Sequence, residues 1–250
     1  AIALKCIEFC IEKNGATSMK NMIKNKCPEA LLRLLALPDH RPSALGLLTK
    51  LSGYGEAGAK SMTFSSGLIF VSKIVSSISD NVTSADGSDS SSIPGLLTTT
   101  NSLLELIVCI TAFVQANPME KVKLDDEEAV STVPDSEVIT DVVLTVNKTL
   151  KLGALPGIGA SKALFSSTQK VCSKILGNIA RWEALEAVEG EEPGPSPREI
   201  VATNGSLPLL LDLLSTPKMI VDSDVETTDG KKKPDDKKDK KKKGEKEAKP

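Results

Sequence analysis

The chain has 250 residues, 40% of them hydrophobic but only 3% aromatic, so aliphatic side chains must form its core, which disfavours a β-sandwich. Residues 231–250 contain eleven lysines and five acids, a net charge of +6; because the whole chain carries −2, residues 1–230 carry −8. No uninterrupted apolar stretch reaches the roughly 18 residues of a membrane span, and no signal peptide is visible, which disfavours a membrane or secreted protein.

The chain starts at Ala1, and a helical pattern is already running at Ile2, so we interpret it as part of a longer protein. Apolar residues recur every three or four positions along residues 1–220, and alternation with a period of two is nearly absent, which predicts helices. The clearest helical stretches, in chain order, are 2–10, 31–35, 44–51, 103–110, 171–179 and 209–214.

Three polar segments interrupt the helical pattern. We expect each to be an unstructured insertion, because it has too little apolar surface to offset the entropy of ordering. The three are residues 80–95, 117–137 and 189–197. For the same reason residues 221–250 are expected to be a disordered, lysine-rich tail. The sequence therefore predicts a helical array over 1–220, followed by this tail.

Two kinds of helical stretch are repeated along the chain. Residues 30–35 (Ala-Leu-Leu-Arg-Leu-Leu) match 209–214 (Leu-Leu-Leu-Asp-Leu-Leu), and 71–75 are a weaker copy. The second kind of stretch has copies at 3–11, 44–52 and 172–180. Self-similarity of this type is typical of repeat proteins, in which each repeat buries its apolar face against its neighbours.

The spacing of the second kind of stretch agrees with a repeat. Phe9 and Lys50 occupy equivalent positions and are 41 residues apart, within the roughly 40–47 residues of common helical repeats. Lys50 and Cys109 are 59 residues apart, and Cys109 and Asn178 are 69 apart. The polar insertions account for most of this excess, so the irregular spacing becomes a regular array with inserted loops.

These stretches resemble the armadillo repeat, in which a short first helix is followed by a Gly-x-x-Pro-x-Leu-x-x-Leu-Leu helix and an Ala-x-x-x-Leu-x-Asn-Leu-Ala helix. The best match is 170–216, where Leu-Gly-Asn-Ile-Ala at 176–180 corresponds to a third helix and 204–214 to the next second helix. The resemblance covers about residues 1–220. It implies an all-α fold, a right-handed superhelix of about four to five repeats (an α-solenoid) with disordered loops and tail.

The resemblance also implies a function, because armadillo arrays bind extended or helical segments of partner proteins in a groove lined by third helices. In peptide-binding members an asparagine of each third helix holds the partner's backbone, and a tryptophan four residues earlier forms a pocket. Here only Asn178 keeps the family residue, and Trp182 lies four residues after it. The residues expected to line the groove are Lys5, Phe9, Lys50, Glu105, Lys174, Asn178 and Trp182. The alternatives are a solvated helix face for the three lysines and packing under the loop after Glu189 for Trp182.

The sequence offers no catalytic or metal-binding constellation. The only histidine, His40, lies in a proline-flanked loop, so neither a nucleophile–base pair nor a zinc pattern can be assembled. Residues 153–162 contain glycines and a lysine but lack the four-residue spacing and the Gly-Lys pair of a phosphate-binding loop. We therefore expect no enzyme, no metal and no cofactor.

The five cysteines lie mostly inside apolar helical patterns: Cys6, Cys10, Cys27, Cys109 and Cys172. An odd number of such cysteines is typical of reduced thiols. We therefore expect a cytoplasmic protein, with the nucleus as a second location.

The basic tail leaves further functions open. Its lysines are Lys231, Lys232, Lys233, Lys240, Lys241, Lys242 and Lys243. They are compatible with a nuclear import signal, a contact to nucleic acid or anionic membrane, or a solubilising tail.

The function that we predict is a non-catalytic, monomeric scaffold or adaptor that binds a protein segment. The alternatives are a chaperone-linked adaptor, a nucleic-acid or membrane-associated factor acting through the tail, and the regulatory part of an enzyme.

Overall fold

A computed structural model describes residues 2–84, 93–120, 130–152, 162–183 and 194–215. The described residues, all of which lie within Ala1–Ser215, form one compact unit.

The fold is all-α, as the sequence predicted, apart from one β-ladder that pairs Met119 with Ser131 and Glu120 with Val130. The helices are α1 (Ile2–Lys24), α2 (Cys27–Leu34), α3 (Arg41–Ser52), α4 (Glu56–Phe64), α5 (Gly67–Ser84), α6 (Ile93–Ala116), α7 (Ser136–Lys151), α8 (Lys162–Ile179), α9 (Pro197–Thr203) and α10 (Ser206–Ser215). The strands β1 (Met119–Glu120) and β2 (Val130–Ser131) lie between α6 and α7.

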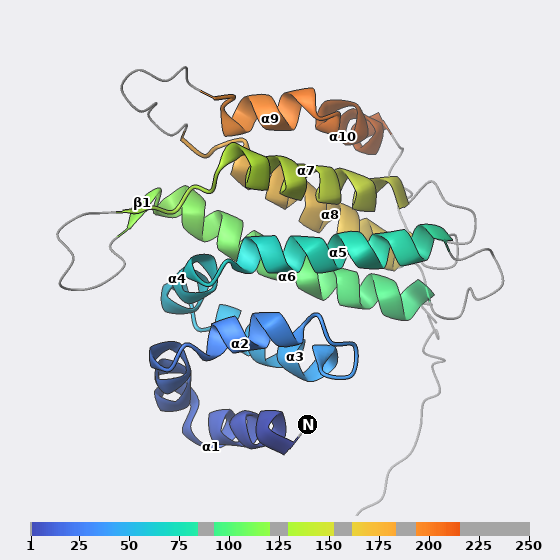
Figure 1. Ribbon diagram of the computed structural model, residues 1–250. Coiled ribbons are helices and arrows are strands. Elements are labelled where there is room, and N and C mark those ends of the chain that lie inside the picture. The colour runs from blue at the N-terminus through green and yellow to red at the C-terminus, as the bar shows by residue number, and fades with distance from the viewer. Residues whose placement is uncertain (1, 85–92, 121–129, 153–161, 184–193, 216–250) are drawn as a thin grey trace, which may run out of the picture. The chain divides into compact units, whose positions relative to one another are not determined.

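The helices other than α4 and α9 form two layers. In layer A, α2 contacts α5, α5 contacts α7, and α7 contacts α10. In layer B, α1 contacts α3, α3 contacts α6, and α6 contacts α8. Each of the pairs α2–α3, α5–α6 and α7–α8 joins the layers, and Figure 1 shows the helices of layer A in front of those of layer B. The short helices α4 and α9 fill the connections.

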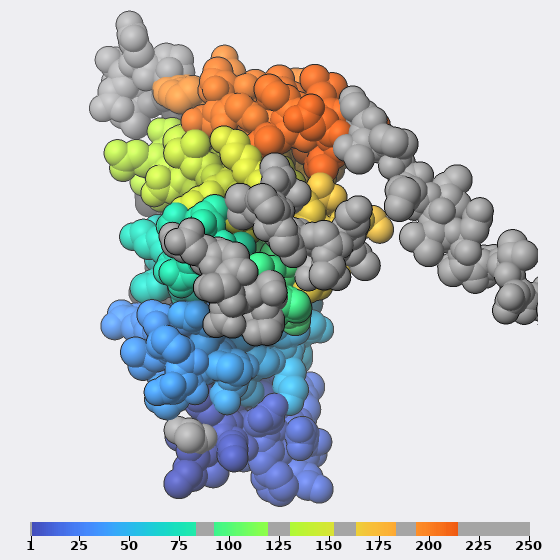
Figure 2. Space-filling model, turned by 90° about the vertical axis from the view of Figure 1, so that its right-hand side faces the viewer, coloured from blue at the N-terminus to red at the C-terminus, as the bar shows by residue number. Residues whose placement is uncertain are grey.

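Every pair of helices in substantial contact is at most three helices apart in chain order. Each helix therefore contacts helices that are close to it in the chain. Figure 2 shows this succession from the blue to the orange atoms of the unit. Such nearest-neighbour packing buries one continuous core although no single helix pair could form one.

Local sequence explains where several helices begin and end. Gly15 breaks α1 with a φ of 35°, a conformation that costs glycine little, so α1 is two helices joined at a kink. Proline stands in the first turn of α2, α3 and α9, where its missing N–H is not needed. The Ser196 side chain accepts a hydrogen bond from the Glu199 N–H, and the Glu199 carboxylate accepts one from the Ser196 N–H, which closes the start of α9.

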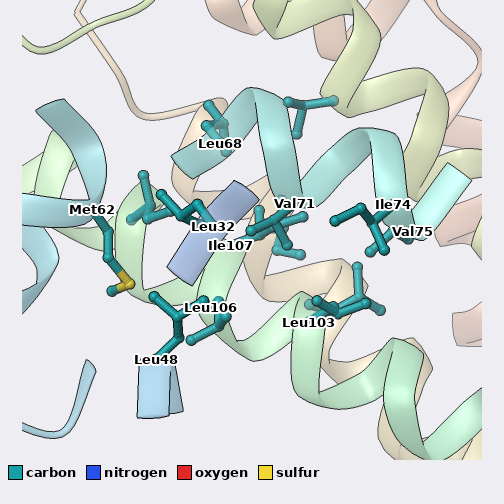
Figure 3. Close-up of a cluster of buried hydrophobic side chains, with 14 of the residues drawn as sticks. Leu32, Leu48, Met62, Leu68, Val71, Ile74, Val75, Leu103, Leu106 and Ile107 are labelled. Atoms are coloured by element: carbon teal, nitrogen blue, oxygen red, sulfur yellow. The ribbon is translucent and has the colours of Figure 1, made fainter. Parts of the chain in front are cut away.

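Aliphatic side chains fill the core, as the composition predicted. Figure 3 shows part of it, where side chains of α2, α3, α4, α5 and α6 meet. Leu32 of α2, Leu48 of α3 and Met62 of α4 are fully buried there against α5 and α6. Val71 and Ile107 supply the facing surfaces of α5 and α6, and both are fully buried.

The predicted insertions are partly ordered. The helix α5 continues to Ser84 and α6 already begins at Ile93, so the helices cover both ends of the segment 80–95. Val82 explains the extension, since its side chain packs in a small buried cluster with Leu97 and Phe165. The segment 117–137 contains the β-ladder and the start of α7, and α9 begins at the last residue of 189–197.

The helix α6 is long and apolar enough to cross a membrane. The helices α4 and α5 are long and apolar enough only if they are taken together, and they are bent by 78° relative to each other. Ten side chains of α6 are buried by other parts of the unit. Its contacts with α3, α4, α5 and α8 account for its apolar composition by packing within the stack.

Candidate protein-binding surface

Layer B packs against layer A on one side, and we call the opposite side the exposed side of layer B. The predicted groove residues are expected to lie there. The helix α6 is covered by α3 and α8 within layer B, by α4 and by α5 of layer A. Its remaining side exposes Thr98, Glu105 and Ala112, which follow one another at intervals of seven residues. Positions seven apart lie on one helix face. The exposed side of α6 is therefore a narrow strip of small side chains with one carboxylate, Glu105.

Lys50 on α3 is used within the unit. Its Nζ lies 3.0 Å from Oε1 of Glu8 and 3.8 Å from Oε1 of Glu12, so it ties α3 to α1. Both acids and the lysine are partly exposed, and ion pairs of this kind contribute little to stability. Lys50 is nevertheless less available to a partner than the sequence suggested, because two carboxylates already neutralise it.

Lys5 and Phe9 lie on the exposed side of α1. The Phe9 side chain is 59% exposed, and the Lys13 Nζ lies 5.6 Å from the centre of its ring. This distance is within the range of a cation–π contact. Both of these predicted groove residues therefore lie on α1, at one end of layer B.

Asn178 and Trp182 join α8 to α6. The Asn178 Nδ2 donates to Oγ1 of Thr111 at 3.0 Å, and the Trp182 Nε1 donates to the Thr111 carbonyl oxygen at 3.0 Å. Trp182 is only 5% exposed and packs in the main core. The structure therefore gives Trp182 a role in packing, where the sequence analysis placed it in the groove as a partner contact.

The exposed side of α8 carries Lys174, which the sequence analysis named, and Lys170, which it did not; both are exposed. An offset of four residues places side chains on one helix face, so Lys170 and Lys174 lie on the same face. Arg181 is exposed as well, but it lies in the turn after α8 ends at Ile179. We call Lys170 and Lys174 the α8 basic line. Their spacing was the available signal, but the sequence alone did not show that α8 would leave this face uncovered.

The predicted site residues are thus distributed over four helices. Glu105 and Lys174 lie on exposed faces of the neighbouring helices α6 and α8, whereas Lys5 and Phe9 lie on α1. The tail lysines, from Lys231 to Lys243, lie outside the described residues.

The thiols of Cys109 on α6 and Cys172 on α8 are poorly reactive. Burial raises the pKa of the Cys172 thiol to about 12. Burial also raises the pKa of Cys109, whose Sγ lies 4.0 Å from the Ser52 carbonyl oxygen. Neither thiol is ionised at neutral pH, and only the thiolate is a strong nucleophile. Among the described residues, no three His, Cys, Asp or Glu side chains gather as a metal site would require.

Comparisons with known proteins leave the fold and the surface to be interpreted on their own. No protein-family model, curated protein or solved structure matches this chain.

Proposed function

We propose that this chain is a non-catalytic scaffold of the armadillo type, which binds a segment of another protein across the exposed side of α6 and α8. The proposal is supported by the way that the repeated stretches fall into the two layers. Phe9, Lys50, Cys109 and Asn178, which are equivalent in the sequence repeat, lie in α1, α3, α6 and α8, the four helices of layer B.

The other kind of repeated stretch supports the same assignment. Residues 30–35, 71–75 and 209–214 fall mainly in α2, α5 and α10, which belong to layer A. A sequence repeat that coincides with a spatial repeat is the property that defines a solenoid. This agreement between sequence and packing is the observation that carries the proposal.

The exposed side of layer B also has the character of a docking surface. At Gly46 on α3 and Gly177 on α8, an added Cβ would meet no atom within 4 Å, so both positions face open space. Together with Thr98 and Ala112 on α6, these residues leave room for the main chain of a partner to approach the helices.

The test compares one blocking substitution on each layer. Peptides are selected from a displayed library on the natural protein, and their affinities are then measured for Ala112→Arg and Leu144→Arg. Ala112 is exposed on α6, and Leu144 of α7, in layer A, is 49% exposed. A large side chain at position 112 is expected to weaken binding about tenfold or more, because it occupies the docking surface.

The Leu144→Arg variant and a chain that lacks residues 231–250 are expected to bind the selected peptides with unchanged affinity. Equal binding by Ala112→Arg and Leu144→Arg would rule out the exposed side of layer B as the binding surface. Loss of binding on tail deletion alone would assign the interaction to the lysines instead.

A further inference from the structure

Exposed apolar side chains gather on the helices at the two ends of the stack. Of the nine large hydrophobic side chains that are exposed in the described residues, two belong to α1 and three to α10. Figure 1 shows these two helices at opposite ends, and they make no substantial contact with each other. Clustered apolar side chains on a surface are typical of protein interfaces.

The first half of α1 carries apolar side chains on two opposite sides. Leu4 and Ile11, seven positions apart, are buried against the rest of the unit. Ile2 and Phe9, also seven apart, are 81% and 59% exposed, and Cys6 between them is exposed as well. With 3.6 residues per turn, Ile2 and Phe9 lie about opposite Leu4 and Ile11. The helix α1 therefore has the pattern of an interior helix, although only one of its two apolar sides is covered.

The helix α10 also has more apolar surface than its neighbours cover. Leu209, Leu210 and Leu213 are partly buried against the core, where α10 contacts α7 and α9. Leu207 and Leu214 are seven positions apart on another side of the helix, and they are 51% and 83% exposed. The helix α10 therefore presents an apolar flank that no other described helix covers.

The order of the helices indicates what each end lacks. The layer A helices α2, α5 and α7 are each paired with the layer B helix that follows in the chain, which is α3, α6 or α8. The helix α10 belongs to layer A, but it has no substantial contact with a described layer B helix. At the other end, α1 belongs to layer B, and no described layer A helix precedes it. Each end thus has the type of helix that would complete a pair at the other end.

We infer that copies of this chain associate head to tail, with α1 of one copy packed beside α10 of the next. The contact forms a helix pair of the same kind as α2–α3, and it covers the exposed apolar sides of both helices. It joins two different surfaces, so it is a heterologous contact that can extend the stack from copy to copy. This association differs from the monomer that the sequence predicted, and it does not depend on the proposed binding of a protein segment.

The burial of apolar surface favours this arrangement over a symmetric one. A symmetric contact between two copies of α1 would leave Leu207 and Leu214 exposed. A symmetric contact between two copies of α10 would leave Ile2 and Phe9 exposed. A head-to-tail contact is the arrangement in which a single interface covers both sets, and the hydrophobic effect grows with the apolar area that is removed from water.

The test compares the full chain with three double variants, each of which places two glutamates at exposed apolar positions. Circular dichroism shows whether each variant is folded. The weight-average mass is measured by sedimentation equilibrium from about 1 μM to about 0.5 mM, a range suited to a small interface. Salt at about 0.3 M screens the attraction between the basic tail and the acidic body of another copy. The variants are Ile2→Glu/Phe9→Glu on α1, Leu207→Glu/Leu214→Glu on α10, and Leu37→Glu/Leu144→Glu as a control outside both helices.

The mass of the natural chain and of the control is expected to rise with concentration. The α1 variant and the α10 variant are each expected to stay monomeric, with association weakened about tenfold or more, because buried glutamates would lose their hydration. An equimolar mixture of these two variants is expected to form a dimer and no larger species, since each variant keeps one intact end. That mixture distinguishes a head-to-tail contact from a symmetric one.

Three results would overturn the inference: a natural chain that is monomeric over the whole range, either end variant associating as the natural chain does, or a mixture of the two end variants that stays monomeric. The second result would assign the contact to two copies of the same helix. Loss of association on deletion of residues 231–250 alone would overturn it as well, and would assign the contact to the tail. None of these results affects the peptide experiment with Ala112→Arg.

Discussion

Trp182 is the only tryptophan in the chain, and it closes the contact between α8 and α6 through its hydrogen bond to Thr111. We expect Trp182→Phe to destabilise the protein by about 2 kcal/mol, because it removes a buried hydrogen bond and part of a buried ring. Urea unfolding followed by circular dichroism measures the change. As a control, Phe64→Leu alters an aromatic side chain that is 37% exposed and should shift the midpoint far less.

An unchanged unfolding midpoint for Trp182→Phe would contradict the packing role.

Trp182 also shows what could not be predicted from the sequence. Its place just beyond a predicted third helix suggested an exposed anchor. What buries it is a contact with α6, 71 positions away in the chain, and local periodicity carries no information about such a contact.

The same limit applies to Lys50, which the sequence analysis placed in the binding groove. The ion pairs with Glu8 and Glu12 depend on how α1 is placed against α3. For the α8 basic line, the spacing of Lys170 and Lys174 already indicated a shared helix face, but only the packing of α8 shows that this face is exposed.

At the scale of single helices, two glycines have opposite roles. An added Cβ at Gly58 of α4 would lie 2.0 Å from the Leu51 carbonyl oxygen, whereas at Gly46 of α3 it would meet no atom within 4 Å. We expect Gly58→Ala to destabilise the protein by about 1–3 kcal/mol, because α4 could no longer approach α3 so closely. Gly46→Ala is expected to stabilise it by about 0.5–1 kcal/mol by removing a flexible residue from a helix interior.

Thermal unfolding of the two variants provides the measurement, and each serves as the control for the other. Two variants of equal stability would mean that the junction between α3 and α4 is looser than the structure indicates. The experiment leaves the docking surface otherwise intact, apart from one methyl group at position 46.

Helix positions were predictable from the sequence where leucines repeat, but less so at α7. There the apolar positions are mostly valines, among them Val142, Val143 and Val146, which are all fully buried. β-branched residues lower helix propensity. The resemblance to the armadillo repeat is therefore weak over 136–169, although the valines have helical spacing. Tertiary contacts with α5, α8, α9 and α10 favour the helix.

For the whole unit, stability should be graded along the stack. The helices α5, α6, α7 and α8 are packed against neighbours on both sides, whereas α1 and α10 have packed neighbours on one side only. In a linear array of helical repeats, the free energy of unfolding is the sum of each repeat's own stability and of its interfaces with the neighbouring repeats. We therefore expect the amides of α5 to α8 to exchange hydrogen more slowly than those of α1 and α10, by at least about tenfold.

Native-state hydrogen exchange with mass spectrometry tests this gradient, with peptides from α6 and α10 as the main comparison. Uniform protection across the unit would indicate a single cooperative globule instead. The all-α class was predictable from the sequence, because apolar residues recur at helical spacing along residues 1–220. How far the helices extend into the polar insertions was not, since residues distant in sequence decide it.

The strands β1 and β2 lie in the connection between α6 and α7. Met119 pairs with Ser131 and Glu120 with Val130, so the chain that leaves α6 lies beside the chain that enters α7. An epitope or a reporter inserted between these paired positions is therefore expected to leave the helices on either side packed as before.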